Sequence, residues 1–164
     1  MSIFRPDRLC DDLFSLPLEE LKAKGVTNIL FDVDNTIVPY NSQKIPEETV
    51  EWFHVTAKEG FRMCILSNNS GERVAPVAEK LGIEYIARAK KPLQNGAKRA
   101  VTLFGVPRDR IALVGDQLLT DMACGNIAGF TTICVKPINP DELWITKWHR
   151  NYEKLLYKLM GIKR

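Results

Sequence analysis

Residues 26–36, VTNILFDVDNT, are the strongest indication of the fold, because an apolar, β-rich run ends there directly in acidic residues. The β-branched and aromatic side chains favour a strand over residues 26–33. Pro46 then opens a helical pattern that Gly60 ends, a start and stop typical of a helix. A strand followed by a helix is the repeating unit of parallel α/β sheets.

The same alternation continues along the chain as far as residue 135. Further strands are expected over residues 61–66, 83–87, 111–114 and 130–135, with helices over residues 72–81, 92–105 and up to about 128. This order predicts an α/β fold, a doubly wound, three-layer, Rossmann-like domain around a five-stranded, mainly parallel sheet. A last helix is expected over about residues 142–160.

The composition is that of an ordinary globular protein and restricts the classes of function. The chain has 164 residues, 45% hydrophobic and 26% charged, which fits one domain over residues 1–164. A net charge of +3 is too weak to indicate a nucleic-acid partner. No apolar run approaches membrane-spanning length, no secretory leader is visible, and the four cysteines form no CxxC pair. We therefore expect a cytoplasmic protein.

Polar side chains follow four of the predicted strands at the point where each strand ends. In chain order they are Asp32 and Asp34, then Ser67 and Asn68, then Lys91, then Asp116 and Asp121. Open α/β sheets bind ligands beyond the carboxyl ends of their strands. These side chains should therefore lie at one rim of the sheet.

The acids after the first strand suit phosphoryl transfer. Residues two apart in an extended segment point to the same face, so Asp32 and Asp34 can address one ligand. One carboxylate can attack phosphorus and form an acyl phosphate, and the other can move protons to the leaving group and from water. Asp116 can complete an Mg²⁺ site with Asp32. Lys91 and Ser67 can hold phosphate oxygens.

Each of these residues also has a simpler structural explanation. An aspartate after a strand often caps the next helix. Asp121 can be a solvated or capping residue, and Thr36 can turn the chain through a hydroxyl-to-backbone bond. The coincidence of the whole set at strand ends favours the functional interpretation.

Four short motifs, in order, resemble those of the haloacid dehalogenase-like (HAD) phosphatases. FDVDNT is similar to the first motif, ILSNN to the second, the second lysine of AKKP to the third and VGDQLLTD to the fourth. The resemblance spans about residues 26–135. It implies a nucleophile at Asp32 and a general acid/base at Asp34.

The resemblance also implies the remaining roles. Ser67 and Lys91 would bind the substrate phosphate, with Asn68 as a further candidate beside them and Thr36 in support. Mg²⁺ would be held by Asp32, the backbone carbonyl of Asp34, Asp116 and, in support, Asp121.

The spacing of the motifs leaves no room for a cap domain. Only 30 residues lie between Thr36 and Ser67, and 23 between Ser67 and Lys91. The chain therefore resembles the capless HAD phosphatases of subclass IIIA. DNT, SNN, the Lys-Pro step and GDQLLTD are most similar to the bacterial YqeG group, which is related to the mitochondrial phosphatidylglycerophosphatases. This resemblance implies phosphatidylglycerophosphate, an anionic phospholipid, as the substrate.

The C-terminal segment has two interpretations. Trp144, Trp148 and Tyr152 lie four residues apart, and the polar side of the same segment carries basic residues, namely Lys147, Arg150, Lys154 and Lys158. Such an amphipathic helix either packs on the sheet or contacts an anionic membrane. A peripheral position at the inner face of the membrane, and an oligomer, are therefore both open.

Two other functions fit the same residues. One is a phosphatase of a soluble sugar phosphate, nucleotide or phosphoprotein. The other is a receiver-like, phospho-accepting signalling domain, which also combines acids, Mg²⁺ and a Lys-Pro step on a doubly wound sheet. In a receiver the Lys-Pro step comes last, whereas here Lys91 precedes the fourth motif, so the order favours an enzyme.

Overall fold

The computed structural model describes residues 3–40, 42–139, 158 and 161, and within them six strands form one sheet. The strands lie in the order β1-β6-β5-β2-β3-β4, and every neighbouring pair is parallel. Their bounds are β1 (Arg8–Cys10), β2 (Asn28–Phe31), β3 (Arg62–Leu66), β4 (Glu84–Ile86), β5 (Ile111–Gly115) and β6 (Thr131–Val135). The predicted doubly wound α/β fold is confirmed.

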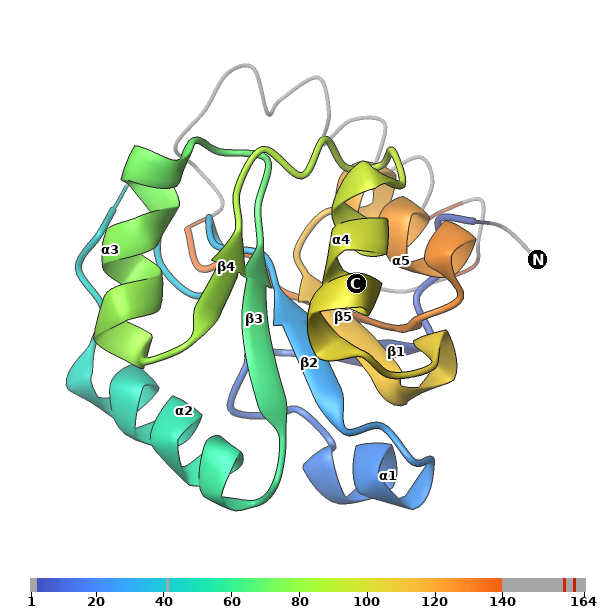
Figure 1. The fold of residues 1–164 in the computed structure, drawn as a ribbon, viewed down its shortest axis with the longest axis horizontal. Coiled ribbons are helices and arrows are strands. Elements are labelled where there is room, and N and C mark those ends of the chain that lie inside the picture. The colour runs from blue at the N-terminus through green and yellow to red at the C-terminus, as the bar shows by residue number, and fades with distance from the viewer. Residues whose placement is uncertain (1–2, 41, 140–157, 159–160, 162–164) are drawn as a thin grey trace.

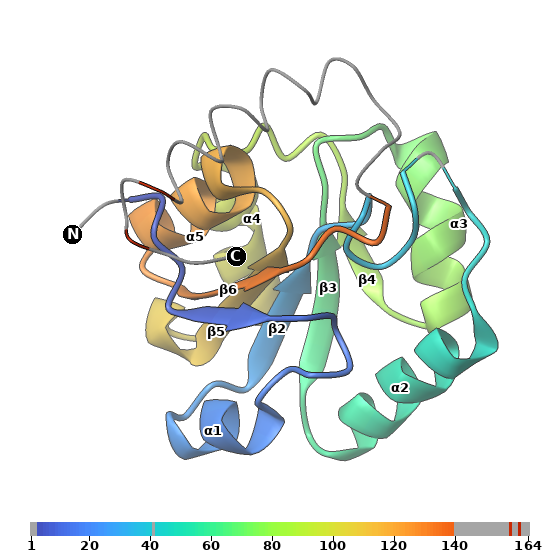
Figure 2. The ribbon, with the colours of Figure 1, turned by 180° about the vertical axis from the view of Figure 1, so that it is seen from behind.

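Helices cover both faces of this sheet. They are α1 (Leu18–Ala23), α2 (Glu47–Lys58), α3 (Gly71–Leu81), α4 (Asn95–Phe104) and α5 (Ala123–Ala128). Ile29 and Phe31 of β2 belong to a core that includes side chains of α1, α2 and α3, whereas Leu30 belongs to a core shared with α4 and α5. Figure 1 shows α4 in front of the sheet, and Figure 2 shows it behind. Successive side chains of β2 therefore point to opposite faces of the sheet. One face packs against α1, α2 and α3, and the other packs against α4 and α5.

The strand order reverses beside β2. From β2 the chain adds β3 and β4 on one side and then crosses to β5 and β6 on the other. The segments that leave β2 and β5 are neighbours, because the amide of Asp32 donates to the carbonyl of Val114 at 2.9 Å. A reversal of this kind opens a crevice at the carboxyl ends of the strands.

The prediction of five strands was wrong by one, since β1 adds a sixth at the edge. This strand has three residues, two of them exposed, and carries no apolar alternation that a sequence could reveal. Its position comes from a long-range contact: the amide of Asp7 donates to the carbonyl of Thr132, and Asp7 Oδ2 accepts from the amide of Thr132 at 2.8 Å.

The predicted cap-free arrangement is confirmed within the described residues. One helix, α2, lies between β2 and β3, and one helix, α3, lies between β3 and β4. Helix α4 begins at Asn95 rather than at Pro92, and the expected helix up to about residue 128 is a π-helical turn, Leu118–Met122, followed by α5. The expected helix over residues 142–160 falls outside the described part of the chain, apart from Lys158. In the described part, no helix has the length and apolar character needed to span a bilayer.

Candidate active site

A hollow of about 570 Å³ opens at the carboxyl ends of the central strands. The segments after β2, β3, β4 and β5 all contribute to its wall. Its lining residues are Asp32, Asp34, Asn35, Tyr40, Ser67, Asn68, Asn69, Lys91, Gln117, Thr120 and Asp121. Six of the seven residues that the sequence places at strand ends therefore line this hollow, and the seventh, Asp116, lies beside Asp32 and Asp121.

Lys91 joins two carboxylates at the base of the hollow. Its ammonium donates to Oδ1 of Asp32 and to Oδ1 of Asp121, both at 2.7 Å. The side chains of Lys91 and Asp121 are only 2% and 1% exposed. Charges buried this deeply are stable only when they are paired and hydrogen-bonded. The three side chains therefore act as one electrostatic unit.

Burial and pairing act in opposite directions on the two sides of this unit. Burial raises the pKa of Asp32 to about 6, although the charge of Lys91 and its hydrogen bond partly offset this effect. Burial alone would lower the pKa of Lys91, but the charges of Asp121 and Asp32 outweigh it and raise that pKa. Lys91 is thus held as an ammonium ion, whereas burial works against the charged form of Asp32.

Three buried acids converge at this point and fit a divalent cation. Asp32, Asp116 and Asp121 each offer a carboxylate oxygen, and these oxygens lie within 4.8 Å of one another. The cluster has three carboxylates, and Lys91, which pairs with Asp32 and Asp121, supplies one ammonium, so the formal charge is negative. Hard cations such as Mg²⁺ bind oxygen ligands of this kind. The donor set therefore matches a divalent metal.

The backbone beneath Asp121 explains the glycine of the fourth motif. A methyl group at Gly115 would lie 2.3 Å from Oδ2 of Asp121, closer than any packed atoms allow. The π-helical turn directs the side chain of Asp121 back toward the end of β5, and its Oδ2 accepts from the amide of Gln117, just beyond that strand, at 3.1 Å. Only glycine at position 115 leaves space for this carboxylate.

Asp34 lies in the wall and contacts residues at the start of α3. Its Oδ1 is 2.5 Å from Nη2 of Arg73, and its Oδ2 accepts a hydrogen bond from the side-chain amide of Asn69.

Thr36, in contrast, is buried at 2% exposure and does not line the hollow. The supporting role expected of Thr36 stays a prediction.

The two candidate phosphate ligands after β3 are arranged differently. Ser67 is buried at the wall, and its hydroxyl accepts from the amide of Asn69 at 3.2 Å. The side chain of Asn68 instead binds the backbone of Lys91: its Oδ1 accepts from the Lys91 amide at 2.6 Å, and its Nδ2 donates to the Lys91 carbonyl at 3.0 Å. These two bonds hold the backbone of Lys91, and the contact expected between Asn68 and phosphate stays a prediction.

Several residues in the wall and behind it were not predicted from the motifs. Asn35 has a left-handed backbone (φ 60), and its side-chain oxygen accepts from the amides of Tyr40 and Asn139. Asparagine tolerates this conformation better than most residues, so DNT carries a weak signal for such a turn. The ion pair of Arg73 has no comparable signal, because it depends on where α3 lies relative to β2.

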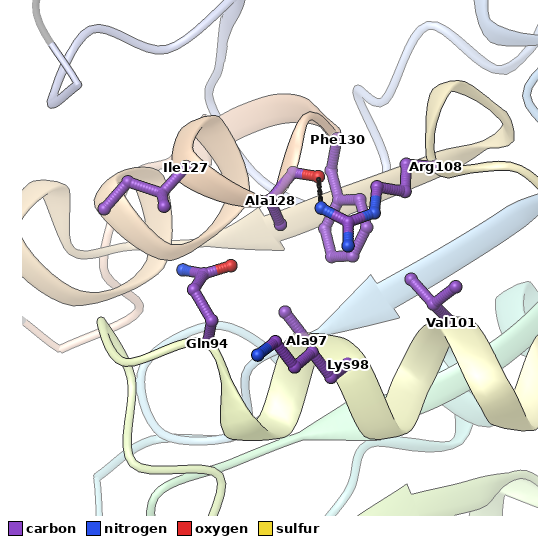
Figure 3. Close-up of a pocket in the computed structure, with 8 residues that line it drawn as sticks. All are labelled: Gln94, Ala97, Lys98, Val101, Arg108, Ile127, Ala128 and Phe130. Carbon is purple, nitrogen blue, oxygen red and sulfur yellow. Dashed lines mark hydrogen bonds between the residues drawn. The ribbon is translucent and has the colours of Figure 1, made fainter.

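A second hollow, of about 290 Å³, lies between α4 and α5 (Figure 3). Its lining includes Lys98, Arg108 and the apolar Ala97, Ile127 and Phe130, but no acidic side chain. Arg108 donates to the carbonyl of Ala128 at 3.3 Å, so it is engaged in the fold. This hollow therefore lacks the carboxylates that nucleophilic or metal-assisted chemistry would need.

Comparison with known proteins agrees with this arrangement. The model of the family described as mitochondrial PGP phosphatase matches residues 1–139. Probable phosphatase YqeG of Bacillus subtilis is 35% identical over 98% of this chain and 92% of its own length. Phosphatidylglycerophosphate phosphatase 1, chloroplastic, of Chlamydomonas reinhardtii is 27% identical over 90% of this chain, which spans 63% of that relative.

Solved structures share the fold. The cobalt-bound deoxy-D-mannose-octulosonate 8-phosphate phosphatase of Haemophilus influenzae superposes with a TM-score of 0.55 at 13% identity, over 85% of this chain and 92% of its own. At that identity the likeness concerns the fold. It assigns the same α/β architecture to both chains.

Proposed function

The chain belongs to the mitochondrial PGP phosphatase family of HAD-like phosphatases, and we propose that it hydrolyses phosphate monoesters through a phospho-aspartyl intermediate on Asp32. Family membership makes it a phosphoric monoester hydrolase. The observation that carries the mechanism is the buried contact of Asp32 with Lys91, next to Asp116 and Asp121, at the base of an open hollow.

The proposed reaction has two displacements. In the first, a carboxylate oxygen of Asp32 attacks phosphorus, the ester P–O bond breaks, and Asp34 gives its proton to the departing oxygen. In the second, water attacks the phosphorus of the acyl phosphate and gives a proton to Asp34. The bond between phosphorus and Asp32 breaks, which releases inorganic phosphate and restores both carboxyl groups.

Charge balance supports the remaining assignments. Lys91 would neutralise Asp32 and a phosphate oxygen, and Ser67 would hold another oxygen. Asp32, Asp116 and the backbone carbonyl of Asp34 would hold Mg²⁺, with Asp121 in support. When bound, the ion supplies positive charge against the phosphoryl oxygens and the clustered acids. Asn68, through its two bonds to the Lys91 backbone, would keep the ammonium in place.

We propose phosphatidylglycerophosphate as the substrate, because the family and the algal relative are both named for phosphatases of this lipid. The hollow is open, as the phosphate of a large lipid would need. Exposed apolar side chains, Tyr40, Leu93 and Ile138, adjoin its wall. Contact with a membrane through residues 142–160, and assembly into an oligomer, belong to this proposal and rest on the sequence alone.

The family favours an enzyme over the receiver-like alternative, and a soluble phosphate ester is the remaining competitor for the substrate. We expect the purified protein to hydrolyse phosphatidylglycerophosphate in mixed micelles with a kcat/KM at least about tenfold above that for soluble sugar phosphates and nucleotides, because remote contacts contribute binding energy. Inorganic phosphate release measures both. If only soluble esters are hydrolysed, the lipid assignment is wrong while the phosphatase chemistry stands.

We also expect Mg²⁺ to stabilise the fold, because it offsets the repulsion among Asp32, Asp116 and Asp121. At a concentration 100 times its Kd, a ligand adds about 2.7 kcal/mol to the free energy of unfolding, which corresponds to a rise in Tm of about 5–10 °C for a chain of this size. Differential scanning fluorimetry with Mg²⁺ or EDTA measures this shift.

Asp116→Asn should reduce the Mg²⁺-dependent shift in Tm, whereas Asp109→Asn, at an exposed acid of the 3₁₀ turn Arg108–Arg110, should keep it. EDTA should also stop phosphate release. A Tm and a rate that are both indifferent to Mg²⁺ and to EDTA would contradict the metal assignment.

A further inference from the structure

Both oxygens of Asp34 are held by residues at the start of α3. Arg73 Nη2 lies 2.5 Å from Oδ1, and the side-chain amide of Asn69 donates to Oδ2. The pair is largely shielded from water, since the side chains of Arg73 and Asp34 are 14% and 12% exposed. A charge-assisted bond in such surroundings is short and directional. The plane of the Asp34 carboxylate is therefore fixed from two sides.

The place of Arg73 in its helix is unfavourable without a partner. Arg73 belongs to the first turn of α3, where its amide donates to the carbonyl of Ser70 at 3.2 Å. The positive end of the helix dipole lies there and disfavours a cation. Among the residues that the structure describes, none accepts a hydrogen bond from Nη1 of Arg73. The Asp34 carboxylate is therefore the contact that accounts for a guanidinium at this position.

We propose that Arg73 is a positioning residue that, with Asn69, fixes the Asp34 carboxyl group at the angle from which it exchanges protons with the reacting oxygens. This inference rests on the acid/base role proposed above for Asp34. Arg73 does not line the hollow, so it acts through Asp34 rather than on the substrate. Proton transfer needs the donor and acceptor within hydrogen-bond reach, and small misplacements lose much of its benefit.

A purely structural role would have a different consequence. The same ion pair connects α3 to the segment after β2, and its loss could loosen that packing. In that case every substrate would be affected alike. Loss of a positioned acid, by contrast, affects a substrate according to its leaving group, because a stable phenolate departs without a proton and a less stable one needs it.

The test compares two phosphate monoesters of nearly equal size, phenyl phosphate and p-nitrophenyl phosphate, in wild type and Arg73→Met. The kcat/KM value reports the steps up to departure of the leaving group. We expect Arg73→Met to lower kcat/KM for phenyl phosphate by about 10- to 100-fold, part of the usual contribution of acid–base catalysis. The value for p-nitrophenyl phosphate should fall less than about threefold.

Three variants complete the comparison. Arg73→Lys, which can reach one oxygen of Asp34, should recover part of the loss on phenyl phosphate. Arg73→Gln keeps a polar group and provides the same comparison if the methionine variant unfolds. Arg62→Met is the matched control, because Arg62 pairs with Glu84 on the surface at the opposite end of β3. It should change neither value.

Asp34→Asn separates this inference from the proposed function. If Asp34→Asn discriminates between the two esters but the Arg73 variants lower both equally, or lower neither, then Arg73 has only a structural role and the inference is overturned. If Asp34→Asn itself shows no discrimination, Asp34 is not the acid, and the proposed mechanism fails together with the inference.

Discussion

Asp32→Asn is expected to lower the rate of p-nitrophenyl phosphate hydrolysis by about 10⁴-fold or more, because the proposed nucleophile is lost. A neutral amide oxygen is a poor nucleophile, and no acyl phosphate can form on it. The effect should be in kcat rather than KM, since Lys91 and Ser67 remain to bind the phosphate. Acid-quenched wild-type enzyme should carry a base-labile phosphate that this variant lacks.

The fold of the Asp32→Asn variant should be intact. Burial raises the pKa of Asp32 from 3.8 to about 6, so the folded chain keeps this proton to a higher pH than the unfolded chain does. The contribution of this carboxyl to the free energy of unfolding therefore falls as pH rises between those two values. In EDTA at pH 7, the asparagine variant should be at least as stable as wild type.

Asp121 supports this expectation, because it continues to pair with Lys91 in the variant. Circular dichroism and thermal unfolding across pH 4–7 would measure both the fold and the pH trend. Wild-type turnover in Asp32→Asn would remove Asp32 as the nucleophile. A collapsed fold would instead mean that the stability argument is wrong, and Asp32→Glu, which keeps the charge, would then be used to test the nucleophile.

Lys91→Met should have the largest effect on stability among these substitutions. The ammonium is the shared partner of two buried carboxylates, and its removal leaves both without that partner. Loss of one member of a buried ion pair costs about 3–5 kcal/mol of folding free energy. Urea denaturation in EDTA would measure this loss. Phosphate release should fall by about 10²- to 10³-fold, as for other groups that stabilise developing negative charge.

Two further lysine variants test whether the compact, buried ammonium of Lys91 accounts for these losses of stability and rate. Lys91→Arg keeps the charge but replaces a compact ammonium by a planar, larger group, so it should recover part of the stability and little of the rate. Lys98→Met changes an exposed lysine of α4 and should alter neither. A Lys91→Met variant within about 1 kcal/mol of wild type would contradict the account of the buried unit.

The central strands of the sheet were predicted closely from the sequence, whereas the edge strand β1 was not predicted. Residues 26–33, 61–66 and 111–114 were expected as strands, and the structure has β2 (Asn28–Phe31), β3 (Arg62–Leu66) and β5 (Ile111–Gly115). Each is apolar over most of its length and lies between turn signals. Strand β1 is short and mostly exposed, so only its contact with Thr132 defines it. Helix α1 was also missed, although Pro17 and Gly25 flank it.

The candidate site, like the fold, was predictable from the sequence only in part. That Asp32, Ser67, Lys91 and Asp116 would lie at one edge follows from parallel strands, whose carboxyl ends share one side of the sheet. The bonds between these side chains and their surroundings do not follow. Asn68 lies beside Ser67 in sequence, yet the path of the chain after β4 turns its amide toward the backbone of Lys91.

Hydrophobic periodicity and turn residues act over a few positions, so local patterns were enough to predict the parallel α/β order, the edge at which the polar residues gather and the lack of room for a cap between the motifs. Tertiary structure alone decided the pairing of Lys91 with two acids, the space that Gly115 leaves for Asp121 and the contact of Arg73 with Asp34. These contacts join residues far apart in the chain at distances of a few ångströms. Only the packing of helices on the sheet sets such distances, and no local pattern encodes it.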